Sequence, residues 1–189
     1  LLLLILTINN SRTVWFVLCS SLAHEMVHLI FIYHFSFAPK RVEFTLFGAN
    51  ITRDLITSSN PNSEIYINAS APVFNIIAGA VFYLSAKLKS EYQVFLTELS
   101  YINFILGFFN FIPFYTFDGG NVLKHLLYKH INVKTTSHIL FLISVVITII
   151  FSFTSIYIFF NYTHNYPLLL ICLYMFLSII FKKKNSLDY

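Results

Sequence analysis

Residues 13–35 read TVWFVLCSSLAHEMVHLIFIYHF, an apolar stretch interrupted near its centre by His24, Glu25 and His28. The stretch is long enough to cross the ~30 Å hydrocarbon core of a bilayer as one helix. Ionisable side chains inside such a span cost a few kcal/mol each, so they usually mark function or pair with one another. The stretch therefore predicts a membrane-spanning helix with a candidate site inside it.

The composition of the whole chain is typical of a membrane protein. Of its 189 residues 57% are hydrophobic and 11% are charged, whereas charged residues make up about a quarter of soluble domains. The apolar runs predict about six spans, the first one truncated. They lie at about 1–8, 13–35, 66–86, 94–115, 139–162 and 166–181. We therefore expect an all-α polytopic membrane protein.

A polar stretch separates the second and third of these spans. Within it, residues 42–47 and 51–55 flank Gly48, Ala49 and Asn50. Apolar segments on either side of a glycine-containing turn indicate a short β-hairpin.

Lys and Arg are distributed unevenly over the two sides of the predicted bundle. Assigning alternate loops to alternate faces places nine of the twelve on one face, which the excess of Lys and Arg in cytoplasmic loops identifies as cytoplasmic. The span at 13–35 then carries His24 and His28 past the membrane midplane from outside, and the span at 94–115 runs in the same direction. We interpret the net charge of +4 as membrane orientation and expect no nucleic-acid partner.

The spacing of His24, Glu25 and His28 is typical of a zinc site. Two imidazoles at positions i and i+4 lie on one helix face, and the glutamate between them can take a proton from water. A catalytic zinc site normally has three protein ligands, and Asp118 is the best candidate for the third because it follows a parallel span. The alternative is a polar cluster that joins helices without a metal.

A second motif follows on the later span, where Asn110 and Pro113 precede Asp118 and Gly119 in the pattern Asn-x-x-Pro-x-x-x-x-Asp-Gly. Together with His-Glu-x-x-His, it resembles the site-2 protease family of intramembrane zinc peptidases over about residues 13–130. Residues 70–75, SAPVFN, resemble the family's Ala-Gly-Pro-x-x-Asn motif, with Ala71 in place of the glycine. The six-span layout is similar to the branch that contains stage IV sporulation protein FB.

The resemblance implies a single transmembrane peptidase domain over residues 1–189. Its three-helix catalytic core would occupy about 13–130, with accessory spans at about 139–181 and no PDZ or cystathionine-β-synthase-type domain. It further implies Zn²⁺ held by His24, His28 and Asp118, with Glu25 as the catalytic base.

Four further residues receive roles from the same resemblance. Asn110 would contact the substrate backbone or the reacting carbonyl oxygen, or else make an interhelical contact. Pro113 would free backbone carbonyls beside a wet pocket. Gly119 and Gly120 would form a tight turn that aims Asp118 inward, or else an ordinary helix stop.

The predicted function is that of a zinc metalloendopeptidase in the bacterial cytoplasmic membrane, with its active site toward the cytoplasm. It would cut a membrane-tethered protein near the cytoplasmic face, and the sporulation branch implies a transcription-factor precursor as substrate. Expected partners are this substrate, the lipid bilayer and regulatory membrane proteins. Two alternatives remain open, a membrane metal carrier or transporter and a catalytically silent membrane scaffold.

Overall fold

The computed structural model describes residues 11–35, 41–45, 48–52, 61–88, 90–161 and 166–185. Its helices are α2 (Ser11–His34), α3 (Pro61–Leu88), α4 (Gln93–Phe111), α5 (Asp118–Tyr128), α6 (Val133–Asn161) and α7 (Tyr166–Asn185), with a short 3-10 turn, η1 (Ser90–Tyr92), before α4. Helices α2, α3, α4 and α6 are long and apolar enough to cross a membrane, and α7 contains a shorter apolar stretch, Leu168–Ile180. The predicted span at 1–8 lies outside the described residues.

The end of α4 differs from the prediction. The helix ends at Phe111, although the span was expected to continue to about residue 115. Ile112 has the extended backbone angles φ −59° and ψ 131°, because a residue before proline is pushed out of the helical region and Pro113 has no N–H to give. The chain turns over residues 112–117 and enters α5 at Asp118.

Two antiparallel strands follow α2. In β1 (Arg41–Thr45) and β2 (Gly48–Thr52), Arg41 pairs with Thr52 and Thr45 pairs with Gly48. The predicted turn at 48–50 is wrong, since these residues already belong to β2. Only two residues separate the strands, the commonest length of a hairpin connection, so Gly48 marks the start of a strand and not the middle of a turn.

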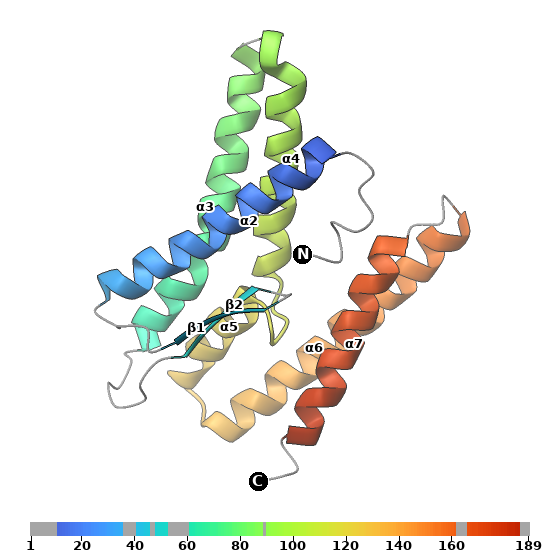
Figure 1. The fold of residues 1–189 in the computed structure, drawn as a ribbon. Coiled ribbons are helices and arrows are strands. Elements are labelled where there is room, and N and C mark those ends of the chain that lie inside the picture. The colour runs from blue at the N-terminus through green and yellow to red at the C-terminus, as the bar shows by residue number, and fades with distance from the viewer. Residues whose placement is uncertain are drawn as a thin grey trace.

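Helices α2, α3 and α4 form the three-helix core. Helix α3 contacts α2, α4 and α5, and α2 crosses the α3–α4 pair obliquely (Figure 1). Near the start of α2, Arg12 Nη2 lies 3.1 Å from Glu98 Oε2 near the start of α4. Further along, Asn103 Nδ2 donates to Ser20 Oγ at 3.1 Å. These two contacts confirm that α2 and α4 run in the same direction.

Small and polar side chains make up much of the buried faces of these helices, whereas many large apolar side chains face outward. On α2, Leu22 and Met26 are exposed while His24 is buried. Between α3 and α4 the backbones approach so closely that a Cβ on Gly107 would lie 2.9 Å from the Pro72 carbonyl oxygen. Close approach through small residues is how helices pack in lipid, where apolar side chains gain nothing by leaving the membrane.

Helices α6 and α7 pack against the turn that leads into α5. The aromatic rings of Phe114 and Phe117 form a buried cluster with Met175 of α7. The Tyr115 backbone N–H donates to Ser144 Oγ of α6 at 3.1 Å, and the Tyr115 hydroxyl donates to the Ser178 carbonyl of α7. Burial, with Tyr174 nearby, raises the pKa of Tyr115 to about 12, so this hydroxyl keeps its proton and remains a donor.

Candidate functional site

The two predicted histidine ligands lie on the buried face of α2. His24 is 5% exposed and His28 is 8% exposed, and their ring centroids are 4.9 Å apart with the ring planes at 88°. Both imidazoles face the interior because residues four apart share one side of a helix. Neighbouring positions on the opposite side carry the apolar residues that face lipid.

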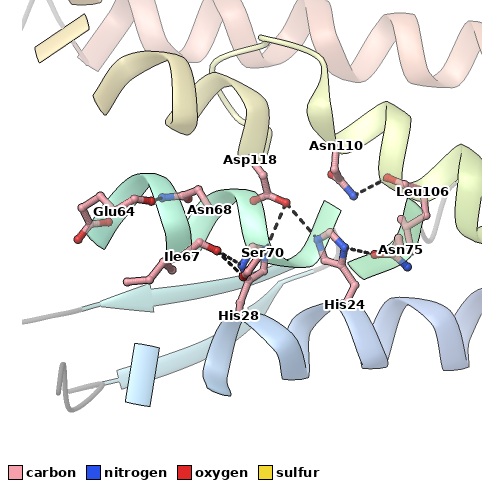
Figure 2. A network of polar contacts seen from close by, with 10 residues as sticks. All are labelled: His24, His28, Glu64, Ile67, Asn68, Ser70, Asn75, Leu106, Asn110 and Asp118. Atoms are coloured by element: carbon pink, nitrogen blue, oxygen red, sulfur yellow. Dashed lines mark hydrogen bonds and ion pairs between the residues drawn. The ribbon is translucent and has the colours of Figure 1, made fainter. Parts of the chain in front are cut away.

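The structure brings Asp118 to these histidines, 90 residues further along the chain. Asp118 Oδ2 lies 3.1 Å from His24 Nε2 and 3.2 Å from His28 Nε2, and the three side chains form a group that could hold a metal ion. Figure 2 shows the carboxylate pointing from α5 toward both rings on α2. Ligand atoms about 2.0–2.2 Å from a tetrahedral zinc ion lie about 3.3 Å from one another, so the two spacings between Asp118 Oδ2 and the imidazole nitrogens suit that ion.

The hydrogen bond on the far side of His28 determines what its Nε2 can do. His28 Nδ1 lies 2.9 Å from the backbone carbonyl oxygen of Ile67. A carbonyl oxygen only accepts, so Nδ1 carries the proton and the neutral ring has a lone pair on Nε2. That lone pair faces Asp118 Oδ2, which is also an acceptor. The two atoms attract each other only through a cation between them.

A proton or a metal ion could be that cation. Protonating both rings would place two imidazolium charges beside each other in a buried site, which is unfavourable. A divalent metal ion satisfies both Nε2 atoms and the carboxylate oxygen at once, so this donor set suits a metal site.

Glu25 differs from its two histidine neighbours in exposure. Its side chain is partly exposed, whereas both rings are buried. It follows His24 directly on α2, at the level of the candidate metal site. The predicted role of Glu25 as the general base stays a prediction.

Asn110 and Pro113 lie between the end of α4 and Asp118. The Asn110 amide donates to the Leu106 carbonyl oxygen of its own helix at 3.1 Å, and Figure 2 draws it on the same side of the site as Asp118. Pro113 lies in the turn after α4. The predicted contact of Asn110 with substrate and the predicted wet pocket beside Pro113 stay predictions.

Glycine is required at positions 119 and 120 for a different structural reason from the one predicted. Both lie in the first turn of α5, not in a tight turn or a helix stop. A Cβ on Gly119 would lie 2.1 Å from the Phe111 carbonyl oxygen, and one on Gly120 would lie 1.9 Å from the Phe114 carbonyl oxygen. The glycines let α5 begin against the backbone of the preceding turn, which places Asp118.

Two site residues were missed as such in the sequence. Asn75, quoted only as part of a motif, lies with its Oδ1 2.6 Å from His24 Nδ1. Asn103 in turn accepts a hydrogen bond from Asn75. A lone asparagine in an apolar span was the available signal for Asn103, because intramembrane amides usually have polar partners.

Comparison with known proteins agrees with this geometry. Residues 85–151 match Peptidase family M50. The chain is 26% identical over 132 residues to a zinc metalloprotease of Methanocaldococcus jannaschii, an alignment covering 66% of this chain and 38% of that protein. The fold is similar to the solved structure of a site-2 protease from the same organism, with a TM-score of 0.68 and 21% identity over 89% of this chain and 76% of that one.

These matches confirm the resemblance to the site-2 protease family that the motifs indicated. The aligned segment spans less than half of the curated relative. The M50 match contains Asn110 and Asp118 but not the histidines of α2. Together with its long apolar helices, the shared fold identifies the chain as an integral membrane protein.

The close approach at Gly120 leads to a testable prediction. Gly120→Ala should destabilise the protein by at least the ~1–3 kcal/mol typical of overpacking, since the new methyl group meets a backbone carbonyl that cannot rotate away. The matched control is Gly79→Ala, where the nearest atom is Phe104 Cδ1 of a side-chain ring at 2.9 Å. Thermal unfolding in detergent should show a clearly larger loss for Gly120→Ala, and equal losses would contradict the packing argument.

Proposed function

We propose that the chain is a zinc-dependent intramembrane endopeptidase that cuts a membrane-tethered protein near the cytoplasmic face. The observation that carries the proposal is the convergence of two imidazole nitrogens and one carboxylate oxygen within 3.1 and 3.2 Å. Three protein ligands that leave a fourth position for water or substrate are typical of catalytic zinc sites.

In the proposed mechanism, His24, His28 and Asp118 would hold the zinc ion, which would act as a Lewis acid toward the scissile carbonyl and would lower the pKa of water toward ~7. Glu25 takes the proton of the attacking water and passes it to the leaving amine. One amide N–H of Asn110 donates a hydrogen bond to the Leu106 carbonyl oxygen. Its second N–H is offered to the reacting carbonyl oxygen, where charge develops in the transition state.

A substrate helix must unwind before it can be cut, because its carbonyls are engaged in its own hydrogen bonds. The β1–β2 pair is an antiparallel sheet of two strands, so each strand has a second edge. We propose that one edge holds the unwound segment in extended form by strand addition. Pro113, by ending α4 beside the site, supports entry of water to the same place.

The orientation and domain assignment belong to the same proposal. The distribution of Lys and Arg supports a cytoplasmic active site, and the contacts of Asp118 Oδ2 with both histidines support a common depth for the three residues. The core at 13–130 and the accessory spans at 139–181 would act as one peptidase domain in the bacterial cytoplasmic membrane. Release of a sporulation transcription factor rests only on the similar span layout.

The role of Glu25 predicts a specific loss. Glu25→Gln should lower cleavage of a co-expressed membrane-tethered substrate by about 10²–10⁴-fold, the usual contribution of a general base. The zinc content should not change, because the amide keeps the shape of the side chain and the histidines are untouched. Glu98→Gln, which alters a carboxylate paired with Arg12 away from the site, should cleave normally. More than trace turnover by Glu25→Gln would remove Glu25 from the mechanism.

The role of Asp118 predicts that the conservative amide fails. Asp118→Asn should lose both zinc and cleavage, since the amide has nearly the same size but lacks the negative charge that holds a divalent ion. Metal mass spectrometry of the purified variant, beside the wild type and Glu98→Gln prepared in parallel, measures the loss. Full occupancy with normal cleavage would show that Asp118 is only part of the first turn of α5.

The orientation predicts where the two ends of α7 are exposed. A reporter fused after Tyr189 should be cytoplasmic, and one inserted at 162–165 should be external, because the Lys run at 182–184 favours the cytoplasmic side. Labelling with a membrane-impermeant thiol reagent in intact cells tests both positions. An externally accessible C-terminus would overturn the orientation and the proposed side of cleavage together.

A further inference from the structure

A chain of uncharged polar side chains is buried between α2, α3 and α4. It contains Ser20, Asn75 and Asn103, which are 6%, 0% and 3% exposed. None of them is a proposed zinc ligand. Uncharged polar groups at membrane depth need partners within the protein. Each of these side chains is hydrogen-bonded to the next, and the donor and the acceptor of each bond can be identified in turn.

The direction is fixed at one end by a backbone carbonyl. One amide atom of Asn103 lies 2.9 Å from the Leu99 carbonyl oxygen. Because a carbonyl oxygen only accepts, this atom must be the nitrogen Nδ2. The same nitrogen donates to Ser20 Oγ at 3.1 Å. The remaining amide atom of Asn103, which faces Asn75, is therefore the oxygen Oδ1.

This orientation is passed on to Asn75. Asn103 Oδ1 can only accept, so the Asn75 atom 2.9 Å away from it is the nitrogen Nδ2. The other end of the Asn75 amide is then its oxygen, which lies 2.6 Å from His24 Nδ1. That nitrogen must donate, so Nδ1 of His24 carries the proton and the lone pair lies on Nε2.

We propose that Asn75 and Asn103 are positioning residues for the metal site, forming an amide relay from Asn103 through Asn75 to His24. The relay holds His24 in the tautomer whose Nε2 lone pair faces Asp118, so that the nitrogen is ready to bind a divalent cation. This inference rests on the proposed role of His24 as a zinc ligand. His28 reaches the same state in one step, through the Ile67 carbonyl.

The relay also fixes where the His24 ring points. It starts from α2 at His24, crosses to α3 at Asn75 and to α4 at Asn103, and returns to α2 at Ser20. Ser20 and His24 share one face of α2 because they are four residues apart. A rotation of the ring or a shift of any one helix would break a bond in this closed circuit. Such outer partners of metal ligands usually contribute about 10–100-fold to metal affinity.

A purely structural contact between α3 and α4 provides the matched control. Ser100 is fully buried, and its hydroxyl donates to the Gly79 carbonyl oxygen at 2.8 Å. It joins the same two helices one turn before Asn103 but has no hydrogen-bonded path to His24 among the described residues. If Asn103 only joins helices, Ser100→Ala and a polar-to-apolar change at Asn103 should affect metal binding alike.

The experiment measures zinc affinity in detergent by competition with a chromophoric chelator. Asn103→Leu, which has no polar atoms, should bind zinc about 10–100-fold more weakly than the wild type. Asn103→Asp should recover most of the affinity, because membrane depth favours the neutral carboxyl, which keeps an oxygen facing Asn75 Nδ2 and an O–H facing the Leu99 carbonyl oxygen. Ser100→Ala should stay close to the wild type. Equal affinity of Asn103→Leu and the wild type, or equal losses in Asn103→Leu and Ser100→Ala, would overturn the relay.

A second measurement does not depend on how the Asn103 variants fold. In metal-free wild-type protein labelled with ¹⁵N-histidine, at a pH where imidazoles are neutral, the chemical shifts report which nitrogen carries the proton. The His24 signals are those that disappear in His24→Gln. A proton on Nδ1 is expected, and a proton on Nε2 would overturn the relay even if Asn103→Leu did not fold.

The outcomes separate this inference from the proposed function. If wild-type protein binds no zinc, or if His24→Gln binds it as tightly as the wild type, the ligand assignment and the relay fall together. If zinc binds through His24 but the affinity does not depend on Asn103, or the wild-type His24 carries its proton on Nε2, the relay alone falls and the zinc site stands.

Discussion

Polar groups buried among membrane-spanning helices must find their partners within the protein, because hydrocarbon offers none. In the α2–α4 core this constraint and the candidate site are inseparable. The hydrogen bonds that satisfy His24 and His28 on their outer sides, to Asn75 and to the Ile67 carbonyl, use up both Nδ1 atoms. Both Nε2 atoms are thereby left facing Asp118. The hydrogen bonds that offset the cost of burying the two rings therefore also leave their Nε2 atoms free to bind a cation. A change in the packing of these helices would for this reason also change the candidate metal site.

Asp118 is placed by a different kind of interaction. The histidines lie on one continuous helix, whereas Asp118 begins a new helix after the non-helical residues 112–117. Apolar packing of Phe114 on Met175 and the hydrogen bonds of Tyr115 to α6 and α7 hold that turn. Helices α6 and α7 carry no proposed ligand. They nevertheless determine where the third ligand stands, so they are part of the site's support and not only of the membrane anchor.

Most of the fold and the two candidate histidine ligands follow from local patterns in the sequence. Span length and apolar runs located α2, α3, α4 and α6, and the i, i+4 spacing identified His24 and His28. Local patterns gave wrong or missing predictions where contacts between distant parts of the chain determine the role of a residue. The role of Gly120 depends on the Phe114 carbonyl, which no local turn rule contains. The role of Asn103 depends on a residue 28 positions earlier on another helix. Strand pairing likewise moved Gly48 from the expected turn into β2.

The geometry of α3 explains how one helix can anchor both histidines of another. Residues 67 and 75 are about 12 Å apart along the axis, whereas His24 and His28 are only about 6 Å apart. The two spacings become compatible because a helical carbonyl points toward the C-terminus of its helix, while a side chain leans toward the N-terminus. The Ile67 carbonyl and the Asn75 amide therefore lean toward each other over Ala71, which is 0% exposed. A larger side chain at 71 would stand between the two acceptors and hold α2 away from both, so the small residue at this position is as necessary to the site as the polar groups that flank it.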